Sequence, residues 1–242
     1  MNNFDMTNNI VHSIGLGPGD PELITIKAKR ILEAADDVIV PQSDVLGRSI
    51  AKDIVDHYVG PSKITMYYFP MNNNREQLRQ RYAELAEKIK ALVAEGRKVS
   101  YVSMGDPTIY STSNYLTDAL LTLGVNVVHV PGISSINASS SLLGMSLSSK
   151  GGDFGVYELP EDAERTAELI QRHQTTVFMK VNKKLPVLLE AIRIQPPAAA
   201  YLVNRVTLDG QMSFDLLNAP LPEEPLYLSI ALVKRTHPKG SR

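Results

Sequence analysis

Short apolar runs alternate with longer amphipathic segments along this chain from residue 10 onward, and this alternation limits the fold more than any other feature. The apolar runs have the length of buried strands. Each is followed by a segment whose apolar residues recur every three or four positions, as on one face of a helix. Strands that alternate with helices in this way are typical of βα units. The sequence therefore predicts an α/β protein with a mainly parallel sheet in its N-terminal half.

The helices of this half are bounded by residues suited to helix ends. Asp20 is expected to cap the first helix and Pro21 to occupy its first position. A longer helix is predicted over residues 78–92, where Leu, Tyr and Ile recur at helical spacing, and Gly96 follows where a left-handed residue suits the end of a helix. These signals predict helices that pack one apolar face against the sheet.

Strands are expected at residues 11–14, 38–40, 99–103 and 125–130. Pro41 is expected to end the second of them, because proline cannot donate a hydrogen bond to a neighbouring strand. Two more helices are predicted, one from the spacing of Leu46, Ile50 and Ile54, and one over residues 116–123 that ends at Gly124.

A stretch of small, polar and glycine residues, GMSLSSKGGD at 144–153, interrupts the alternation. We place a domain boundary there, with one α/β domain over residues 1–146 and a second over 147–242. In the second domain the pattern predicts strands near residues 154–157, 176–181, 199–203 and 227–233, and helices near 162–173 and 184–193. Asp209-Gly210 resembles a hairpin turn, so the second sheet is expected to contain antiparallel pairs.

Composition excludes several classes of function. With 25 Lys and Arg against 26 Asp and Glu, the formal net charge is -1, which disfavours a nucleic-acid binder. The chain has no cysteine, and its five histidines are scattered, so no metal site is expected. No run of about 18 apolar residues occurs, and the first ten residues lack the features of a signal peptide. We expect a soluble cytoplasmic protein that does not interact with membranes.

The first candidate site is the glycine turn formed by Gly15, Gly17 and Gly19, directly after a predicted strand. A turn of this kind lets a ligand approach the backbone closely. The dinucleotide-binding pattern would need a sixth-position glycine, but Asp20 stands there, and no acidic residue ends the second strand. An NAD site is therefore disfavoured, and the alternative is a plain tight turn.

Two more turns follow predicted strands. In the first, Asp106 lies between Gly105 and a proline, and it could act as a general base, as a hydrogen-bond acceptor or only as a turn residue. In the second, PGISS at 131–135, the hydroxyls could bind a ligand or cap a helix. Ligands of open α/β sheets bind at the carboxyl ends of the strands, so three such turns indicate the rim of one crevice.

The three turns read GLGPGDP, GDPTIYST and PGISS, and in this order and spacing they resemble the signature turns of the tetrapyrrole methylase family. The resemblance spans nearly the whole chain, with VYELP, TTVFMKV and YLSIALVKR placed where that family has strands of its second domain. FPM at 69–71 and YSTSNYL at 110–116 are most similar to the members that methylate C20 of precorrin-2. Met104 departs from the pattern, because family members more often have glycine or an acid before GDP.

The resemblance implies two αβα domains with a ligand trough between them, a homodimer, and an S-adenosylmethionine cofactor that is released as S-adenosylhomocysteine. Carried onto matching positions, it implies cofactor contacts from Pro18, Gly105, Asp106, Ile109, Ser134, Ser135, Met179 and Ala231. It also implies a tetrapyrrole substrate, precorrin-2 or cobalt-precorrin-2, with many carboxylates. Arg48, Lys180 and Arg205 are candidates to pair with these carboxylates, or else ordinary surface charges.

The expected reaction is the transfer of a methyl group to the C20 meso carbon during cobalamin synthesis. Positioning is expected to dominate, since the methyl donor is already activated. For the proton that leaves the carbon, Asp106 is the first candidate acceptor or relay, followed by Tyr110 and Tyr227. The alternatives are a methyltransferase of the same fold that acts on another precorrin position, on RNA or on a protein, and a nucleotide-binding oxidoreductase.

Overall fold

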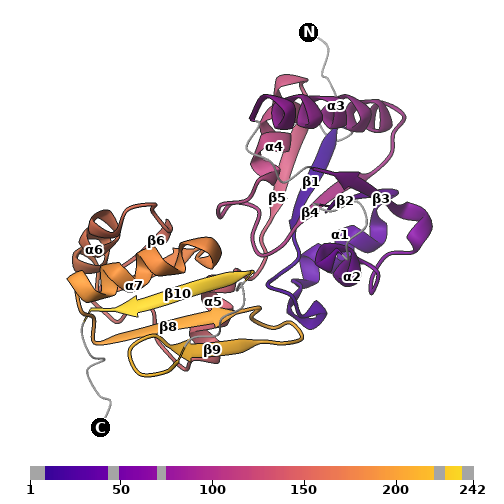
Figure 1. Cartoon of the computed structure of the whole chain (residues 1–242). Helices are drawn as coiled ribbons and strands as arrows, with labels where there is room; N and C mark the ends of the chain where they lie inside the picture. The colour runs from indigo at the N-terminus through magenta and orange to yellow at the C-terminus, as the bar shows by residue number, and fades with distance from the viewer. Residues whose placement is uncertain (1–8, 43–48, 70–74, 221–226, 236–242) are drawn as a thin grey trace. The chain divides into compact units, whose positions relative to one another are not determined.

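The computed structural model describes residues 9–42, 49–69, 75–220 and 227–235. Contacts between residues divide the chain into two compact units, residues 1–134 and 135–242. Each unit contains one five-stranded sheet with its own helices (Figure 1). This confirms the predicted α/β class, with a parallel sheet in the first half and a mixed sheet in the second.

The first sheet has the strand order β3-β2-β4-β1-β5, and all its strand pairs are parallel. Its strands are β1 (Ile10–Gly15), β2 (Asp37–Gln42), β3 (Ile64–Tyr68), β4 (Val99–Ser103) and β5 (Asn126–Val130). Its helices are α1 (Ile26–Ala34), α2 (Ile50–Val55), α3 (Arg75–Ala94) and α4 (Ser113–Thr122). The sequence did not predict β3, whose residues are partly exposed at the edge of the sheet.

The order of the strands explains where the helices lie. The chain passes through α1 and α2 toward the β3 edge and returns through α3 and α4 toward the β5 edge. Right-handed crossovers in opposite directions place the two pairs of helices on opposite faces. Two separate core clusters agree with this: Leu32 and Ile54 pack with Ile14, and Leu85 packs in the other cluster with Val11.

Two sequence expectations for this unit are corrected. Asp20 does not cap the first α-helix; its carboxylate accepts from the Glu22 N–H at 2.8 Å and caps a short 3-10 helix. Extended backbone follows, and α1 begins after Thr25, whose hydroxyl caps it. Pro41 does not end β2 but lies within it. The ladder with β4 stops at Ile39, so β2 has an unpaired edge at Pro41, where a missing N–H is tolerated.

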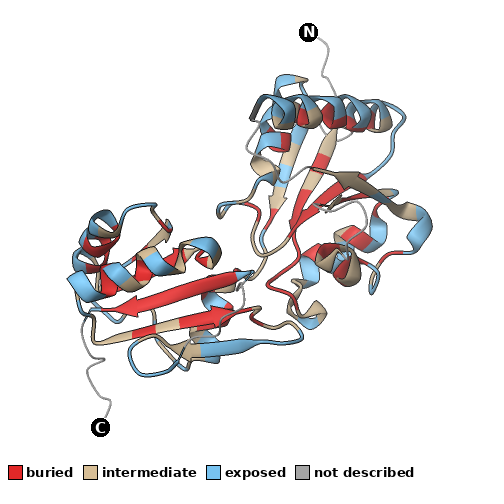
Figure 2. Ribbon diagram, viewed as in Figure 1, coloured by how far each residue is buried: buried red, intermediate tan, exposed pale blue. Residues whose placement is uncertain are grey.

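The second sheet has the strand order β6-β7-β10-β8-β9. Its elements are α5 (Ser135–Leu142), β6 (Phe154–Glu158), α6 (Ala163–Arg172), β7 (Thr175–Met179), α7 (Leu185–Ile194), β8 (Ala199–Asn204), β9 (Met212–Asp215) and β10 (Ser229–Lys234). β10 is buried along its whole length (Figure 2) and runs antiparallel to both β7 and β8. The predicted hairpin is confirmed, with Gly210 at a positive φ between β8 and β9.

The division between the units lies earlier than the boundary expected after residue 146. Contacts separate the chain between Ser134 and Ser135, because α5 packs against β10 of the second sheet. The glycine- and serine-rich segment at 144–153, which indicated a boundary, is instead a loop inside the second unit.

A polar chain fixes the edge strand β6 to the end of α6. The imidazole of His173 lies 2.7 Å from the Asp153 carboxylate through Nδ1 and 2.7 Å from the Tyr157 hydroxyl through Nε2. Hydrogen bonds from the Gln174 N–H and from His173 hold the pKa of Asp153 below its usual value. A Cβ added to Gly155 would lie 2.5 Å from the His173 ring, so glycine makes room for it. These contacts give His173 a structural role.

Candidate functional site

The three turns singled out by the sequence follow three neighbouring strands of the first sheet. They leave the carboxyl ends of β4, β1 and β5, which are adjacent in the strand order. From β1 the chain leaves toward one edge of the sheet, and from its neighbour β4 it leaves toward the other. A reversal of this kind opens a crevice at the carboxyl ends of the strands, where open α/β sheets bind their ligands.

The turns after β1 and β4 are joined by main-chain hydrogen bonds. Gly105 N–H donates to Gly17 O at 2.7 Å, and Gly17 N–H donates to Gly105 O at 3.2 Å. Both glycines have left-handed backbone, with φ of 82° for Gly17 and 67° for Gly105. Glycine adopts this conformation without the steric cost that other residues meet, so glycine at these two positions allows the pair of hydrogen bonds to form.

The turn after β5 packs against the other two without any side chain between them. A Cβ added to Gly132 would lie 2.1 Å from Gly105 O and 2.8 Å from the Gly15 carbonyl carbon. A Cβ added to Gly15 would lie 2.5 Å from Gly105 O and 2.7 Å from Gly132 N. Only glycine fits at these two positions, and main-chain groups of all three turns therefore meet at one point.

Asp106 bridges two of these turns. Its Oδ1 accepts from Thr108 N at 2.8 Å and from Thr108 Oγ1 at 2.5 Å, and its Oδ2 accepts from Gly132 N at 3.1 Å. Partial burial raises the pKa of Asp106, but the hydrogen bonds from Thr108 and Gly132, with a smaller effect of His129, bring it below its usual value. The carboxylate is thus ionised at neutral pH, and its geometry suits a hydrogen-bond acceptor better than a base.

The other residues predicted for this end of the site lie on the same turns. Pro18 and Ser134 are buried, and Ile109 is half-buried. Tyr110 is 43% exposed and has a left-handed φ of 47°, which is strained for a residue other than glycine. The first unit therefore brings together five of the predicted cofactor residues: Pro18, Gly105, Asp106, Ile109 and Ser134.

The remaining predicted residues belong to the second unit. Ser135 begins α5, Met179 ends β7, and Ala231 is fully buried in β10. Tyr227 lies two residues before β10 and is 51% exposed. Lys180 directly follows β7, and its ammonium lies 3.0 Å from the Glu158 carboxylate.

Strained backbone, which the sequence did not indicate, occurs in the second sheet where β7 and β8 end and β10 begins. Lys180, Arg205 and Leu228 have φ of 58°, 52° and 63°. Because β10 runs antiparallel to β7 and β8, its start lies beside the ends of those strands, and all three residues share this edge. Strain in non-glycine residues tends to accumulate at functional sites. Arg205 is oriented by a hydrogen bond from its Nε to Asp209 O at 2.8 Å.

Arg48 lies outside the described residues, as do two residues of FPM at 69–71. Within the described ranges, no three His, Asp or Glu side chains gather as a metal site would require. No helix in the part of the chain that the structure describes is long and apolar enough to cross a membrane.

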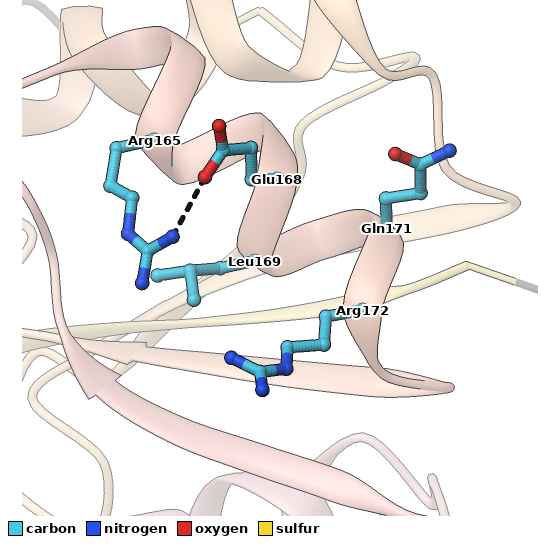
Figure 3. Close-up of a pocket in the computed structure, with 5 residues that line it drawn as sticks. All are labelled: Arg165, Glu168, Leu169, Gln171 and Arg172. Carbon is cyan, nitrogen blue, oxygen red and sulfur yellow. Dashed lines mark hydrogen bonds and ion pairs between the residues drawn. The ribbon is translucent and has the colours of Figure 1, made fainter.

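A shallow concavity lies elsewhere, on the surface of α6 (Figure 3). It is lined by Arg165, Glu168, Leu169, Gln171 and Arg172. Arg165 Nη1 lies 2.7 Å from Glu168 Oε2, and both side chains are more than half exposed. All five residues come from one helix and none was predicted for the site, so this concavity carries no candidate chemistry.

Comparisons with known proteins identify one family. A model of the family described as tetrapyrrole (corrin/porphyrin) methylases matches residues 11–218. A probable cobalt-precorrin-2 C(20)-methyltransferase of Methanocaldococcus jannaschii is 33% identical, over 93% of this chain and 96% of that protein. A precorrin-2 C(20)-methyltransferase of Sinorhizobium sp is 31% identical, over 91% of this chain and 93% of that protein.

Solved structures share the fold. The X-ray structure of a cobalt precorrin-4 methyltransferase matches with a TM-score of 0.73 at 19% identity, over 95% of this chain and 96% of that chain. A uroporphyrin-III C-methyltransferase from Thermus thermophilus, complexed with S-adenosylhomocysteine, matches with a TM-score of 0.66 at 21% identity, over 93% and 96% of the two chains. The family model covers most of the chain, the relatives cover nearly all of it, and the three turns coincide at one edge; this chain belongs to the tetrapyrrole (corrin/porphyrin) methylase family.

Proposed function

We propose that this chain transfers a methyl group from S-adenosylmethionine to the C20 meso carbon of precorrin-2 or cobalt-precorrin-2, in the synthesis of the corrin ring of cobalamin. The tetrapyrrole substrate follows from the family. The C20 position is supported by the names of two relatives at about 30% identity and by the FPM and YSTSNYL segments.

The observation that carries the proposal is the contact of three main-chain turns at Gly15, Gly105 and Gly132. An edge built from glycine backbone has no side chains that would keep a ligand away from its N–H and C=O groups. In this proposal the cofactor is held there by Pro18, Gly105, Asp106, Ile109 and Ser134. The proposed contacts of Ser135, Met179 and Ala231 rest on the resemblance to the family. The bound cofactor supplies a methyl group already activated on a sulfonium sulfur.

The protein's own part in this reaction is positioning. Asp106 keeps the GDP and PGISS turns together through its bonds to Thr108 and Gly132, and so holds the cofactor end of the site. Its lowered pKa makes it a poor acceptor for the proton that leaves C20. Tyr110 and Tyr227, which are 43% and 51% exposed, are the proposed residues for relaying that proton to solvent.

The cations proposed for the substrate carboxylates are Arg48, Lys180 and Arg205. Arg205 is the strongest of the three, because its bond to Asp209 O uses only Nε and leaves the two terminal nitrogens for a bidentate pair with a carboxylate. Lys180 would have to exchange Glu158 for a substrate carboxylate.

A direct test is to incubate the protein with carbon-13 methyl-labelled S-adenosylmethionine and precorrin-2, with and without cobalt, and to locate the label by NMR. A single label at C20 is expected. A label on a pyrrole-ring carbon or at another meso bridge would reject the C20 position, but the proposal that the chain is a tetrapyrrole methyltransferase would stand. Calorimetry with S-adenosylhomocysteine and with NAD should show binding of the first only, and the opposite result would reject the methyltransferase as well.

A homodimer is part of this proposal and rests on the resemblance to the family alone. Sedimentation at micromolar concentration is expected to give twice the chain mass. A monomer under these conditions would remove the homodimer from the proposal without affecting the chemistry.

A further inference from the structure

Four aromatic rings of the first unit form a continuous ladder. Tyr67 and Phe69 have ring centroids 5.1 Å apart, Phe69 stacks on Tyr82 at 4.3 Å, and Tyr82 lies 5.7 Å from Tyr115. Spacings of this size are typical of favourable aromatic pairs. The ladder begins at the carboxyl end of β3, passes through α3 and ends in the first turn of α4.

The local structure explains why these rings meet. Tyr67 and Phe69 are two residues apart in an extended segment, so both point to the same face of the sheet. Tyr82 lies on the inner face of α3 and is 3% exposed. Tyr115 lies on α4, which packs directly against α3, as Figure 1 shows. The Tyr67 end is fixed by a hydrogen bond from its hydroxyl to Arg81 O at 3.2 Å.

Tyr82 therefore connects the two segments that are most similar to the family members that methylate C20. Phe69 is the first residue of FPM, and Tyr115 belongs to YSTSNYL. Both segments follow carboxyl ends of strands in the first sheet, at the same edge as the three glycine turns. Tyr115, the last ring of the ladder, lies in the first turn of α4 and is 47% exposed.

We propose that Tyr82 is a positioning residue for the tetrapyrrole, which holds Phe69 and Tyr115 as one surface and thereby sets which carbon of the macrocycle meets the methyl donor. This inference rests on the proposed function. The exposed ring of Tyr115 offers the macrocycle a stacking partner, and Tyr82 keeps that ring in place from behind.

Tyr82→Leu and Tyr82→Phe test this role, with Tyr101→Leu and Tyr101→Phe as matched controls. Tyr101 is a buried tyrosine of the same core cluster, with its hydroxyl 2.6 Å from Thr117 Oγ1, and it has no place in the ladder. Tyr82→Leu removes the ring contacts with Phe69 and Tyr115. Loss of the contact that supports Tyr115 is expected to raise the KM for the tetrapyrrole about 2- to 12-fold. Affinity for S-adenosylhomocysteine is expected to stay unchanged.

The position of the carbon-13 label distinguishes positioning from a structural role. Tyr82→Leu is expected to place label on more than one carbon, Tyr82→Phe to restore the single position because it keeps the ring, and both Tyr101 variants to give the product of the wild type. If Tyr82→Leu and Tyr101→Leu give the same KM and the same product, the inference is wrong. If Tyr82→Leu does not fold, Tyr115→Leu decides, because loss of this half-exposed ring should raise the KM for the tetrapyrrole, and a wild-type KM and product would contradict the inference.

Each variant is compared with the wild type at whichever carbon the wild type labels. A wild-type label away from C20 would therefore count against the proposed function. The comparison of variants with the wild type would still test whether Tyr82 positions the tetrapyrrole.

Discussion

Replacing Gly132 by alanine tests whether contact between the three turns builds the cofactor end of the site. The new Cβ would lie 2.1 Å from Gly105 O and 2.9 Å from Gly15 Cα, and both neighbours are main-chain atoms that cannot rotate away. To reach an ordinary contact distance, the turn after β5 must move by about 1 Å, and overpacking of this kind costs about 1–3 kcal/mol. We expect a value near 3 kcal/mol, because two other turns resist the movement. If that cost falls on the binding-competent arrangement, affinity for S-adenosylhomocysteine drops roughly 100-fold.

Gly60→Ala is the matched control. It lies in the same unit, its φ is negative, and an added Cβ would meet nothing within 4 Å. Calorimetry with S-adenosylhomocysteine and urea unfolding should be measured on both variants and on the wild type. Weak binding by Gly132→Ala beside wild-type binding by Gly60→Ala is expected. Wild-type affinity and stability in Gly132→Ala would show that the turns do not need this contact.

Three further predictions concern single side chains. Asp106→Asn is expected to destabilise the protein by about 1–3 kcal/mol, because the amide cannot accept from both Thr108 and Gly132, and to weaken cofactor binding more than turnover at saturation. Asp162→Asn, at the N-cap of α6, is the control. Loss of turnover alone in Asp106→Asn would show that Asp106 acts as the base. Asp153 has a lowered pKa, so its contribution to stability is present at neutral pH and is lost as the pH falls through about 4 and below. The urea midpoint of Asp153→Asn should therefore depend less on pH in this range than that of the wild type. An unchanged dependence would show that the Asp153 carboxylate does not stabilise the protein. Arg205→Gln is expected to raise the KM for the tetrapyrrole about 10-fold with cofactor affinity unchanged, whereas Arg193→Gln, which loses only an exposed pair with Glu190, should leave both parameters as in the wild type.

Local features of the fold could be predicted because local interactions determine them. The bounds of β4 at 99–103 were predicted as they stand, since a buried run followed by a glycine turn has little choice of conformation. The start of α1 could not be predicted, because Asp20 and Thr25 are both suitable N-cap residues. The extended backbone between them determines that the α-helix begins after Thr25. β3 was missed since an edge strand with partly exposed residues lacks a clear alternation.

Features that join distant parts of the chain needed the structure. The sequence predicted three turns at strand ends but not that β4, β1 and β5 are neighbours, so the contact of Gly15 with Gly132 could not be foreseen. The bond from Gly132 to Asp106 spans 26 residues, and it favours a role as hydrogen-bond acceptor among those that the sequence left open for Asp106. The ladder through Tyr82 was likewise hidden, because its rings come from three elements separated by long stretches of chain.

The central place of β10 has a consequence for how the chain folds as it is synthesised. The sheet of the first unit is complete once β5 has emerged from the ribosome, so that unit can fold while the rest of the chain is still being made. In the second unit, β7 pairs with β6 and β8 with β9, but the two pairs are not joined until β10, the last of the described strands along the chain, inserts between β7 and β8. Until then the nascent chain exposes the unpaired edges of two apolar strands, which is where chaperone binding or aggregation should occur during translation.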